Sequence, residues 1–529
     1  MKSSLVSFLL LLIHFNSSCK FIESKNNHSI TNTYSDTIDA AIVAGSFIES
    51  SPISVDSLQI NQFFRVYTNL RPYQEEVFLF YRNRSYELAW HDNLGKIEAF
   101  QILFNRVMQM EVNGFTEQVP YLDDFKRLAN KGKNDSVDFV DVMQTAQYFH
   151  FARRVLEGLP EKDLHALDWY IPKIKKNYTE LLDKFIAGEQ DAIDKSVYPQ
   201  YQLLRKGLIH LRQIQQKGGW QIVPFIGNAL SEGKISPIVQ LIKKRLKLGG
   251  DWENNDSSQL FTPELTQAIH LFQQRHGLLT DGIVGRSTLQ ALNISVEDRI
   301  KQVMINMERC RWLPITVEKN YLVVNIPAFQ LQVMEADSLI FSCEAIVGKE
   351  TNKTAVFMGM MKYIVFNPYW NIPDQIVEKE IIPEIAKNKD YLKENHMEWT
   401  DGRLRQLPGL DNALGAIKFL FPNPFDIYLH DTPAKGLFKE QKRAFSHGCI
   451  RISAPYQLAT YLLREQAGWS KQQIDDLLST KKENYVKLEK KVPVYILYLT
   501  AFVDVEGQLN FRDDIYHKDQ ALTRLLIKN

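Results

Sequence analysis

The segment Ser446-His447-Gly448-Cys449-Ile450-Arg451 brings a cysteine, a histidine and an arginine together, and His430 lies nineteen residues before Cys449. Cysteine acts in acyl transfer as a thiolate, and a nearby imidazole with a fixed cation is the usual means of forming one at neutral pH. His430 follows the strand-like run Ile427-Tyr428-Leu429, so its side chain can point into a cleft at a strand end. The segment therefore predicts a cysteine–histidine active site in a domain built on strands.

The neighbouring residues suggest individual roles. We expect Cys449 to be the nucleophile and His430 to be the base, which takes the thiol proton and returns a proton to the leaving amine. Gly448 suits a tight turn, and the backbone N–H groups of Gly448 and Cys449 are candidates for an oxyanion hole. Arg451 either binds a substrate carboxylate or braces the loop through an ion pair. His447 either orients the substrate or hydrogen-bonds to the backbone.

A metal site is the alternative use of these side chains, since His430, His447 and Cys449 are all zinc-ligand types. The sequence has no H-E-x-x-H or C-x-x-C companion motif, and ligands at positions i and i+2 are awkward for one metal. We therefore expect no metal.

Length and charge limit the class of protein. A chain of 529 residues is too long for one core, so we expect two to four domains. The 63 basic and 62 acidic residues give a net charge of +1, whereas nucleic-acid-binding proteins normally carry a basic excess. No internal stretch approaches the roughly 20 apolar residues that span a bilayer.

The N-terminus predicts export. Lys2 precedes an apolar run from Leu5 to Phe15, which is the length of a signal-peptide core. Small residues then precede Cys19, so residues 1–19 are predicted to be a signal peptide, with either lipidation of Cys19 or simple cleavage near it. Asn16 stands where a lipoprotein signal usually has an aliphatic residue. Residues 20–47 are rich in Asn, Ser and Thr and are predicted to be a linker.

Cysteines are scarce. Only Cys19, Cys310, Cys343 and Cys449 occur, and loss of the first with the signal would leave an odd number and at least one free thiol. A disulfide scaffold is excluded by this scarcity. Cys310 and Cys343 lie in apolar surroundings and are predicted to be buried small hydrophobic residues.

Helical periodicity dominates the first half of the chain. Residues 48–232 are predicted to be an α-helical scaffold domain without a chemical motif, with Phe80-Tyr81 and Trp90 in its core. Residues 233–294 predict a compact helical unit, in which Pro263 starts a helix and Ala268, Leu271 and Phe272 lie on one face of it. The run F-Q-Q-R-H-G-L-L-T-D-G-I-V-G-R-S-T-L-Q-A-L-N from Phe272 resembles the three-helix peptidoglycan-binding domain. Such modules either bind ligand or serve as structural insertions.

The pattern changes to strands after a connector at 295–320. A mainly β catalytic domain is predicted at 321–500, followed by a C-terminal segment at 501–529. A helical insertion from Gln375 to Asn395 is placed to be a lid. Its Ile376, Val377, Ile381 and Ile382 are expected to cover an apolar floor, while Glu378, Lys379 and Glu380 face water. The predicted strands are Tyr321–Ile326, Leu331–Val333, Ser342–Val347, Tyr363–Phe366, Asp426–Leu429 and Val492–Leu499.

The runs I-Y-L-H-D-T-P and S-H-G-C-I-R-I-S resemble the active-site signature of the L,D-transpeptidase catalytic domain. Together with the unit at 233–294, they resemble the large multi-domain L,D-transpeptidases of Gram-negative envelopes. The likeness covers roughly residues 50–529, and Cys310 departs from its pattern. Flanking blocks that agree are Asn306–Arg309, Arg311–Pro314, Asn367–Pro373, Pro408-Gly409 and Asn412–Gly415.

The resemblance implies a reaction on peptidoglycan in the periplasm. Cys449 would attack the bond between meso-diaminopimelate and D-Ala of a tetrapeptide stem, and an amine of a second stem would resolve the thioester as a 3→3 cross-link. Water as acceptor would give a carboxypeptidase. No cofactor is implied, and carbapenems are expected to acylate Cys449. The Asp431 carbonyl would complete the dyad, and Arg451, Tyr428, Trp370 and Asn371 would bind substrate.

Two alternatives stay open beside a cross-linking enzyme. One is an envelope cysteine hydrolase with the same dyad, in which water outcompetes the amine. The other is a non-catalytic wall-binding scaffold, which would have a degraded Cys/His pair, whereas Cys449 and His430 are both present. The sequence leaves the oligomeric state open.

Overall fold

The computed structural model describes residues 42–43, 54–115, 118–130, 137–225, 227–315, 318–336 and 338–526. The predicted signal peptide at 1–19, with Cys19, lies outside these ranges, as does most of the predicted linker. Two residues of that linker, Ile42–Val43, form β1 and pair in parallel with β3 (Gly95–Ile97). Among the described helices, none combines the length and the apolar character needed to cross a bilayer.

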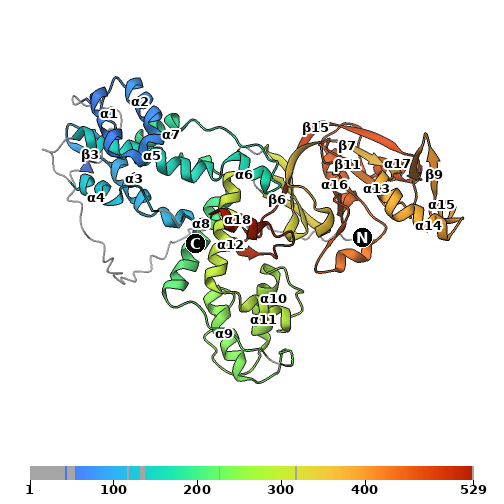
Figure 1. Cartoon of the computed structure of the whole chain (residues 1–529). Helices are drawn as coiled ribbons and strands as arrows, with labels where there is room; N and C mark the ends of the chain where they lie inside the picture. The colour runs from blue at the N-terminus through green and yellow to red at the C-terminus, as the bar shows by residue number, and fades with distance from the viewer. Residues whose placement is uncertain are drawn as a thin grey trace, which may run out of the picture. The chain divides into compact units, whose positions relative to one another are not determined.

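The predicted scaffold domain is helical, as expected (Figure 1). Its longest helix, α5 (Val137–Glu157), carries buried residues on every side and is therefore a central helix rather than a surface one. Phe80, Tyr81 and Trp90 are buried, as predicted. The other elements are α1 (Ser57–Val66), η1 (Thr68–Tyr73), α2 (Gln74–Asn83), β2 (His91–Asp92), α3 (Glu98–Met108), η2 (Met110–Asn113), α4 (Leu122–Ala129), α6 (Glu161–Ala166), α7 (Tyr178–Ile186), η3 (Asp194–Ser196) and α8 (Gln200–Gln216).

The unit at 233–294 contains three helices, α9 (Pro237–Gly249), α10 (Pro263–Arg275) and α11 (Arg286–Leu292), around a core of its own. The Thr262 hydroxyl accepts from the Leu265 N–H at 3.3 Å, and Pro263 follows at the first helical position. Of the three residues placed on one face of this helix, Ala268 and Phe272 are buried. Leu271 is 55% exposed, because the buried face of α10 is centred on Leu265, Ile269 and Phe272.

The catalytic domain is built on a nine-stranded sheet in the order β13-β6-β14-β12-β11-β7-β15-β4-β5. Strand β5 also pairs with β6, so the sheet closes on itself around a large apolar core. The predicted strand Asp426–Leu429 is shorter and shifted, because Asp426 has a φ of 52° and β12 comprises only Leu429–His430. The other strands are β4 (Asn320–Asn325), β5 (Gln330–Glu335), β6 (Ser338–Gly348), β7 (Phe357–Phe366), β11 (Ile417–Leu420), β13 (Ala444–Ser446), β14 (Ile450–Ile452) and β15 (Asn484–Leu497).

Shorter helices connect or cover these strands. The helix α16 follows β14 directly and supplies Leu458 and Ala459 to the core of the sheet. These elements are η4 (Ile326–Ala328), η5 (Glu350–Asn352), η7 (Lys435–Lys439), α16 (Pro455–Leu463) and α17 (Lys471–Ser479).

The predicted helical insertion is a small subdomain rather than a few helices. It also contains a three-stranded sheet in the order β8-β10-β9, and Val377 and Ile381 pack with Leu404 of that sheet. Ile382 is 49% exposed, so the expectation that it covers an apolar floor is wrong. Figure 1 shows this subdomain grouped at one end of the catalytic domain. Its elements are β8 (Trp370–Asn371), α13 (Asp374–Ile376), the π-helical turn Val377–Ile381, α14 (Ile382–Lys387), α15 (Tyr391–Glu394), β9 (Met397–Thr400) and β10 (Arg403–Gln406).

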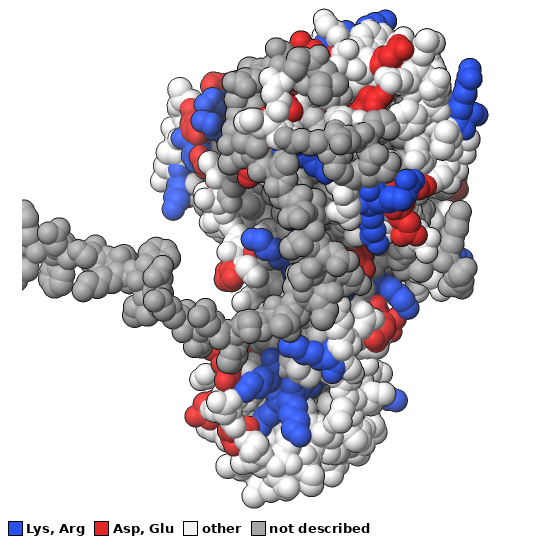
Figure 2. Space-filling model, turned by 90° about the vertical axis from the view of Figure 1, so that its left-hand side faces the viewer, with Lys and Arg blue, Asp and Glu red and all other residues white. Residues whose placement is uncertain are grey.

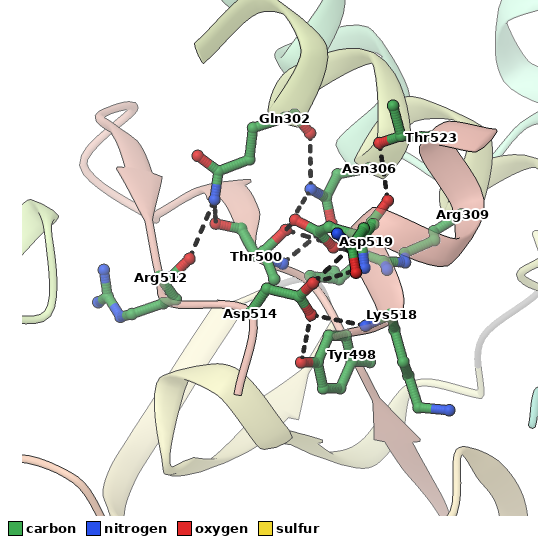
Figure 3. A network of polar contacts seen from close by, with 12 residues as sticks. Gln302, Asn306, Arg309, Tyr498, Thr500, Arg512, Asp514, Lys518, Asp519 and Thr523 are labelled. Carbon is green, nitrogen blue, oxygen red and sulfur yellow. Dashed lines mark hydrogen bonds and ion pairs between the residues drawn. The ribbon is translucent and has the colours of Figure 1, made fainter. Parts of the chain in front are cut away.

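The predicted connector at 295–320 is largely a helix, α12 (Val296–Arg311), which is buried along most of its length and packs against α8. The C-terminal segment forms β16 (Ala501–Val503), β17 (Leu509–Phe511) and α18 (Lys518–Leu526). Figure 3 shows the polar network that joins these parts. Arg309 pairs with Asp519 at 2.6 Å, and Thr500 donates to the same carboxylate at 2.6 Å. The described part of the C-terminal segment is therefore tied to α12 through α18.

The near-neutral net charge hides a local basic surface. Figure 2 shows Lys and Arg side chains gathered on the lower part of one face, at the level of α8 and α9, whereas the upper part mixes both signs. On α9, Lys244 and Lys247 are exposed, whereas Lys243 and Arg245 are buried.

Candidate active site

Three neighbouring strands carry the centre of the candidate site. His430 on β12 lies opposite Lys418 on β11 and opposite Arg451 on β14. Cys449 directly precedes β14, whose Ile450 is in register with Leu429, so the cysteine lies beside the residues just before His430. Strand pairing therefore brings together the two residues that the sequence singled out, as well as a lysine that it did not.

His430 is arranged as a neutral imidazole. Its side chain is buried, and its Nδ1 lies 2.5 Å from the carbonyl oxygen of Asp431. A carbonyl can only accept, so the proton is on Nδ1 and the lone pair is on Nε2. Burial, with Arg451 and then Lys418 adding positive charge, lowers the pKa of His430 to about 3, although the Asp431 carbonyl acts in the opposite direction.

Asp431 is itself fixed in place, which holds its carbonyl toward His430. Its carboxylate accepts from the Ala416 N–H at 2.9 Å and from the Lys435 ammonium, and its N–H donates to Ile417 at 2.9 Å. Gly415 is required next to it, because a Cβ there would lie 2.4 Å from the Asp431 side chain.

Cys449 is half-buried, and its Sγ lies 3.5 Å from the carbonyl oxygen of Asp426. Burial raises the pKa of the thiol, while hydrogen bonding with Tyr428 and the charge of Lys418 act against this rise. With the low pKa of His430, the resting pair is a thiol and a neutral imidazole. The role expected for His430, as the base that takes the thiol proton, stays a prediction; in it, the proton leaves Sγ during the attack.

The turn before Cys449 suggests which backbone N–H group can donate a hydrogen bond to an oxyanion. Gly448 has a φ of 118°, and its N–H already donates to the Ser446 hydroxyl at 3.1 Å. Its carbonyl accepts from Thr354 at 2.8 Å, which locks the turn. Within the described part of the chain, the Cys449 N–H has no hydrogen-bond partner. Of the two N–H groups considered from the sequence, that of Cys449 is the free one.

The other candidate residues lie either beside Cys449 and His430 or in the insertion. Arg451 lies at the site, and within the described ranges its buried Nε has no hydrogen-bond partner and its guanidinium has no ion pair. Trp370 and Asn371 form β8 in the insertion, where they pair with β10. His447 connects the two places, since its Nε2 lies 2.8 Å from Glu380 Oε1 in the insertion.

Sequence reasoning missed Lys418 and Asp426. Lys418 alternates with Ile417 and Phe419, which marks it as facing the open side of a strand, but only the pairing with β12 reveals its place beside His430. Both residues line a cavity of about 470 Å³ next to Cys449, together with Tyr428 and Tyr485. No cluster of His, Cys, Asp or Glu suited to a metal ion is found in the described ranges.

Comparison with known families agrees with this arrangement. The L,D-transpeptidase catalytic domain family matches residues 319–496, the Scaffold domain family matches 75–208, and a family provisionally described as a peptidoglycan binding domain matches 236–292. A protein of Haemophilus influenzae, provisionally named an L,D-transpeptidase, is 32% identical over 263 residues, which are 45% of this chain and 53% of the relative. The chain thus spans about half the length of this curated relative.

Among the solved structures that comparison finds are two L,D-transpeptidases. That from Xylanimonas cellulosilytica (its residues 123–326) is 16% identical and covers 52% of this chain and 99% of its own, with a TM-score of 0.18. That from Stackebrandtia nassauensis is 14% identical and covers 51% of this chain and 94% of its own, with a TM-score of 0.22. On the family matches and the curated relative, the chain carries an L,D-transpeptidase catalytic domain, joined to a peptidoglycan-binding domain and a scaffold domain.

Proposed function

We propose that this protein forms 3→3 cross-links between peptidoglycan stems through a thioester on Cys449. The observation that carries the proposal is the buried His430, whose Nδ1 is occupied by the Asp431 carbonyl so that Nε2 carries the lone pair, on a strand paired with the one that begins directly after Cys449. The catalytic-domain match supports an acyl transferase that modifies peptidoglycan.

The first half-reaction would cleave the donor stem. Sγ of Cys449 attacks the carbonyl carbon between meso-diaminopimelate and D-Ala, and His430 Nε2 takes the thiol proton as the S–C bond forms. The Cys449 N–H would stabilise the oxyanion. When the C–N bond breaks, His430 returns the proton to the leaving nitrogen, so D-Ala departs as a neutral amine and the thioester remains.

The second half-reaction would resolve the thioester. The side-chain amine of a second stem attacks the thioester carbonyl, His430 takes a proton from that amine, and Cys449 leaves as a thiol after receiving it. The product is an amide between two diaminopimelate residues. Water in place of the amine gives a tripeptide, which is the carboxypeptidase alternative.

Other residues would bind and orient the stems. Arg451, whose buried Nε lacks a partner among the described residues, would bind a substrate carboxylate, and Tyr428 would form a wall beside Cys449. Trp370 and Asn371 would act through the insertion, as parts of a lid. His447 would hold that lid and orient the substrate.

The setting of this reaction is the cell envelope. Both the peptidoglycan-binding and the catalytic domain matches favour peptidoglycan as the substrate and the periplasm as the location. The signal-like residues 1–19 favour export, with Cys19 as a membrane tether if it is lipidated.

Incubation of the protein with a disaccharide-tetrapeptide, followed by mass analysis of the products, tests the proposal. A dimer that has lost one D-Ala supports cross-linking. Tripeptide alone would show that the protein is a carboxypeptidase, and unchanged tetrapeptide would contradict both activities.

A further inference from the structure

The cavity beside Cys449 contains two opposite charges that do not neutralise each other. Lys418 and Asp426 both line the space of about 470 Å³. Within the described ranges, neither side chain forms an ion pair, and neither makes a hydrogen bond. Lys418 is partly buried, and such a charge is normally paired, so its ammonium is available to a ligand; the Asp426 carboxylate is exposed and also accessible.

Lys418 is held in position even without a carboxylate partner. Its ammonium lies 3.9 Å from the centre of the Tyr428 ring, which is a cation–π contact. Burial lowers the pKa of Lys418, while Cys449 and Glu483 act against this. The Glu483 carboxylate already accepts from the Tyr369 N–H at 2.9 Å.

The walls between the two charges are largely apolar. Leu420, Phe421 and Ile427 line the cavity, together with the rings of Tyr363 and Tyr485. The site therefore suits a ligand with an apolar stem and a zwitterionic end. Cys449 does not line the cavity itself, but the carbonyl of Asp426, a lining residue, lies 3.5 Å from Cys449 Sγ.

Diaminopimelate has this chemistry, because its side chain is a run of methylenes that ends in an amino group and a carboxylate. In the donor stem, this side chain starts at the carbon next to the carbonyl that Cys449 would attack. We propose, on the basis of the function proposed above, that the cavity binds the side-chain end of the donor's diaminopimelate, with its carboxylate at Lys418 and its ammonium at Asp426.

Measuring D-Ala release in the absence of an acceptor stem restricts the assay to the binding and cleavage of the donor stem. Two tetrapeptides are compared, one with diaminopimelate and one with its side-chain carboxylate converted to carboxamide. The wild type should favour the carboxylate by about ten- to hundredfold in kcat/KM, as expected for a hydrogen bond to a charged group. Lys418→Met should reduce this ratio to within about threefold. Lys418→Arg should largely keep it.

The ratio of the kcat/KM values for two substrates of one enzyme does not depend on the fraction of enzyme that is folded. A partly unfolded Lys418→Met variant therefore remains informative. Lys487→Met is the matched control, since Lys487 is an exposed lysine on β15, separated from β11 by β7, and does not line the cavity. It should keep the wild-type ratio. Asp426→Asn should reduce the preference for a free side-chain amine over its acetylated form, and Asn tolerates the positive φ at this position.

The inference is overturned if Lys418→Met keeps the full preference or if the wild type shows none. It is also overturned if amidation matters only on the acceptor stem during cross-linking, because the cavity would then serve the acceptor. Failure of the wild type to release D-Ala from either donor would instead contradict the proposed function itself.

Discussion

Glu380 in the π-helical turn of the insertion accepts a hydrogen bond from His447 in the loop that carries Cys449, with 2.8 Å between Oε1 and Nε2. π-Helical turns are rare in proteins overall, but those that occur are often found at functional sites. Both side chains are substantially exposed, so the contact between the insertion and the loop is weak enough to open and close. The finding gives the predicted lid a specific attachment point.

Loss of this contact should weaken substrate capture without unfolding the protein. We expect Glu380→Ala to lower kcat/KM for cross-linking by up to about fivefold, in line with the roughly 0.2–1 kcal/mol of an exposed ion pair. Glu378→Ala, on the same turn and exposed, is the control and should behave as wild type. Unchanged cross-linking by Glu380→Ala would show that the contact does not serve as a latch.

A point substitution is a better test of the lid than removal of Gln375–Asn395. That deletion would take away Val377 and Ile381, which cover Leu404 in the small core of the insertion. The remaining strands would then expose apolar surface, and a loss of activity would have two explanations.

The protonation state of Cys449 predicts an unusual pH profile for alkylation. Because burial raises the pKa of this thiol and lowers that of His430 to about 3, the resting enzyme holds little thiolate at neutral pH. The rate of modification by iodoacetamide should therefore rise steadily with pH from 6 to beyond 9. A thiolate–imidazolium pair would instead give a plateau that begins in mildly acid solution, and such a plateau would contradict this assignment.

His430 should also make stability depend on pH. Its pKa is about 3 in the folded protein and near 6.5 in an unfolded chain, so the unfolded chain binds more protons between these values. Stability should thus rise with pH from 3 to 6.5, by an amount on the order of 3–5 kcal/mol. Urea unfolding at pH 4.5 and pH 7 should show a smaller difference for His430→Gln than for the wild type. Equal differences would mean that the imidazole is not buried as a neutral group.

The ranking of the two histidines provides a kinetic test. His430→Ala should reduce D-Ala release by roughly 10²–10⁴-fold, which is the range for loss of a general base. His447→Ala should cost less, because His447 is exposed and contacts the insertion rather than the dyad. Single-turnover rates for both variants check this, and the opposite order would exchange their roles.

Local motifs made much of this molecule predictable. The helical periods, the turn of the peptidoglycan-binding unit and the Cys449 segment each lie within a short stretch, so they can be read without knowing the fold. Lys418 and Asp426 could not be found in this way, because their place depends on pairing between β11 and β12 and on a positive φ. The protonation of Cys449 depends on burial, which no local pattern encodes.

The predicted connector at 295–320 also contains a contact that depends on the folded structure and cannot be read from a local pattern. Its Arg309 is buried and paired with Asp519, more than two hundred residues later. A buried charge acquires its partner only when the chain has folded. The C-terminal segment, to which no role was assigned from sequence, supplies that partner.

This pairing between α12 and α18 should contribute strongly to the stability of the protein. Arg309→Met leaves Asp519 largely buried without its cation and should cost about 3–5 kcal/mol in the free energy of unfolding. Lys301→Met, on the exposed side of the same helix, is the matched control and should change stability by less than about 1 kcal/mol. Guanidinium unfolding compares them, and similar midpoints would show that the network is not a main support.

The central claim is that Cys449 carries the acyl group, and intact-protein mass spectrometry under single turnover with a tetrapeptide donor tests it most directly. The account predicts one tripeptide adduct per chain, mapped to Cys449 and absent from Cys449→Ala. Cys310→Ala and Cys343→Ala should keep the adduct, since burial raises the pKa of both thiols, to about 12 for Cys310. A tripeptide adduct of the same mass on Cys449→Ala would contradict the account.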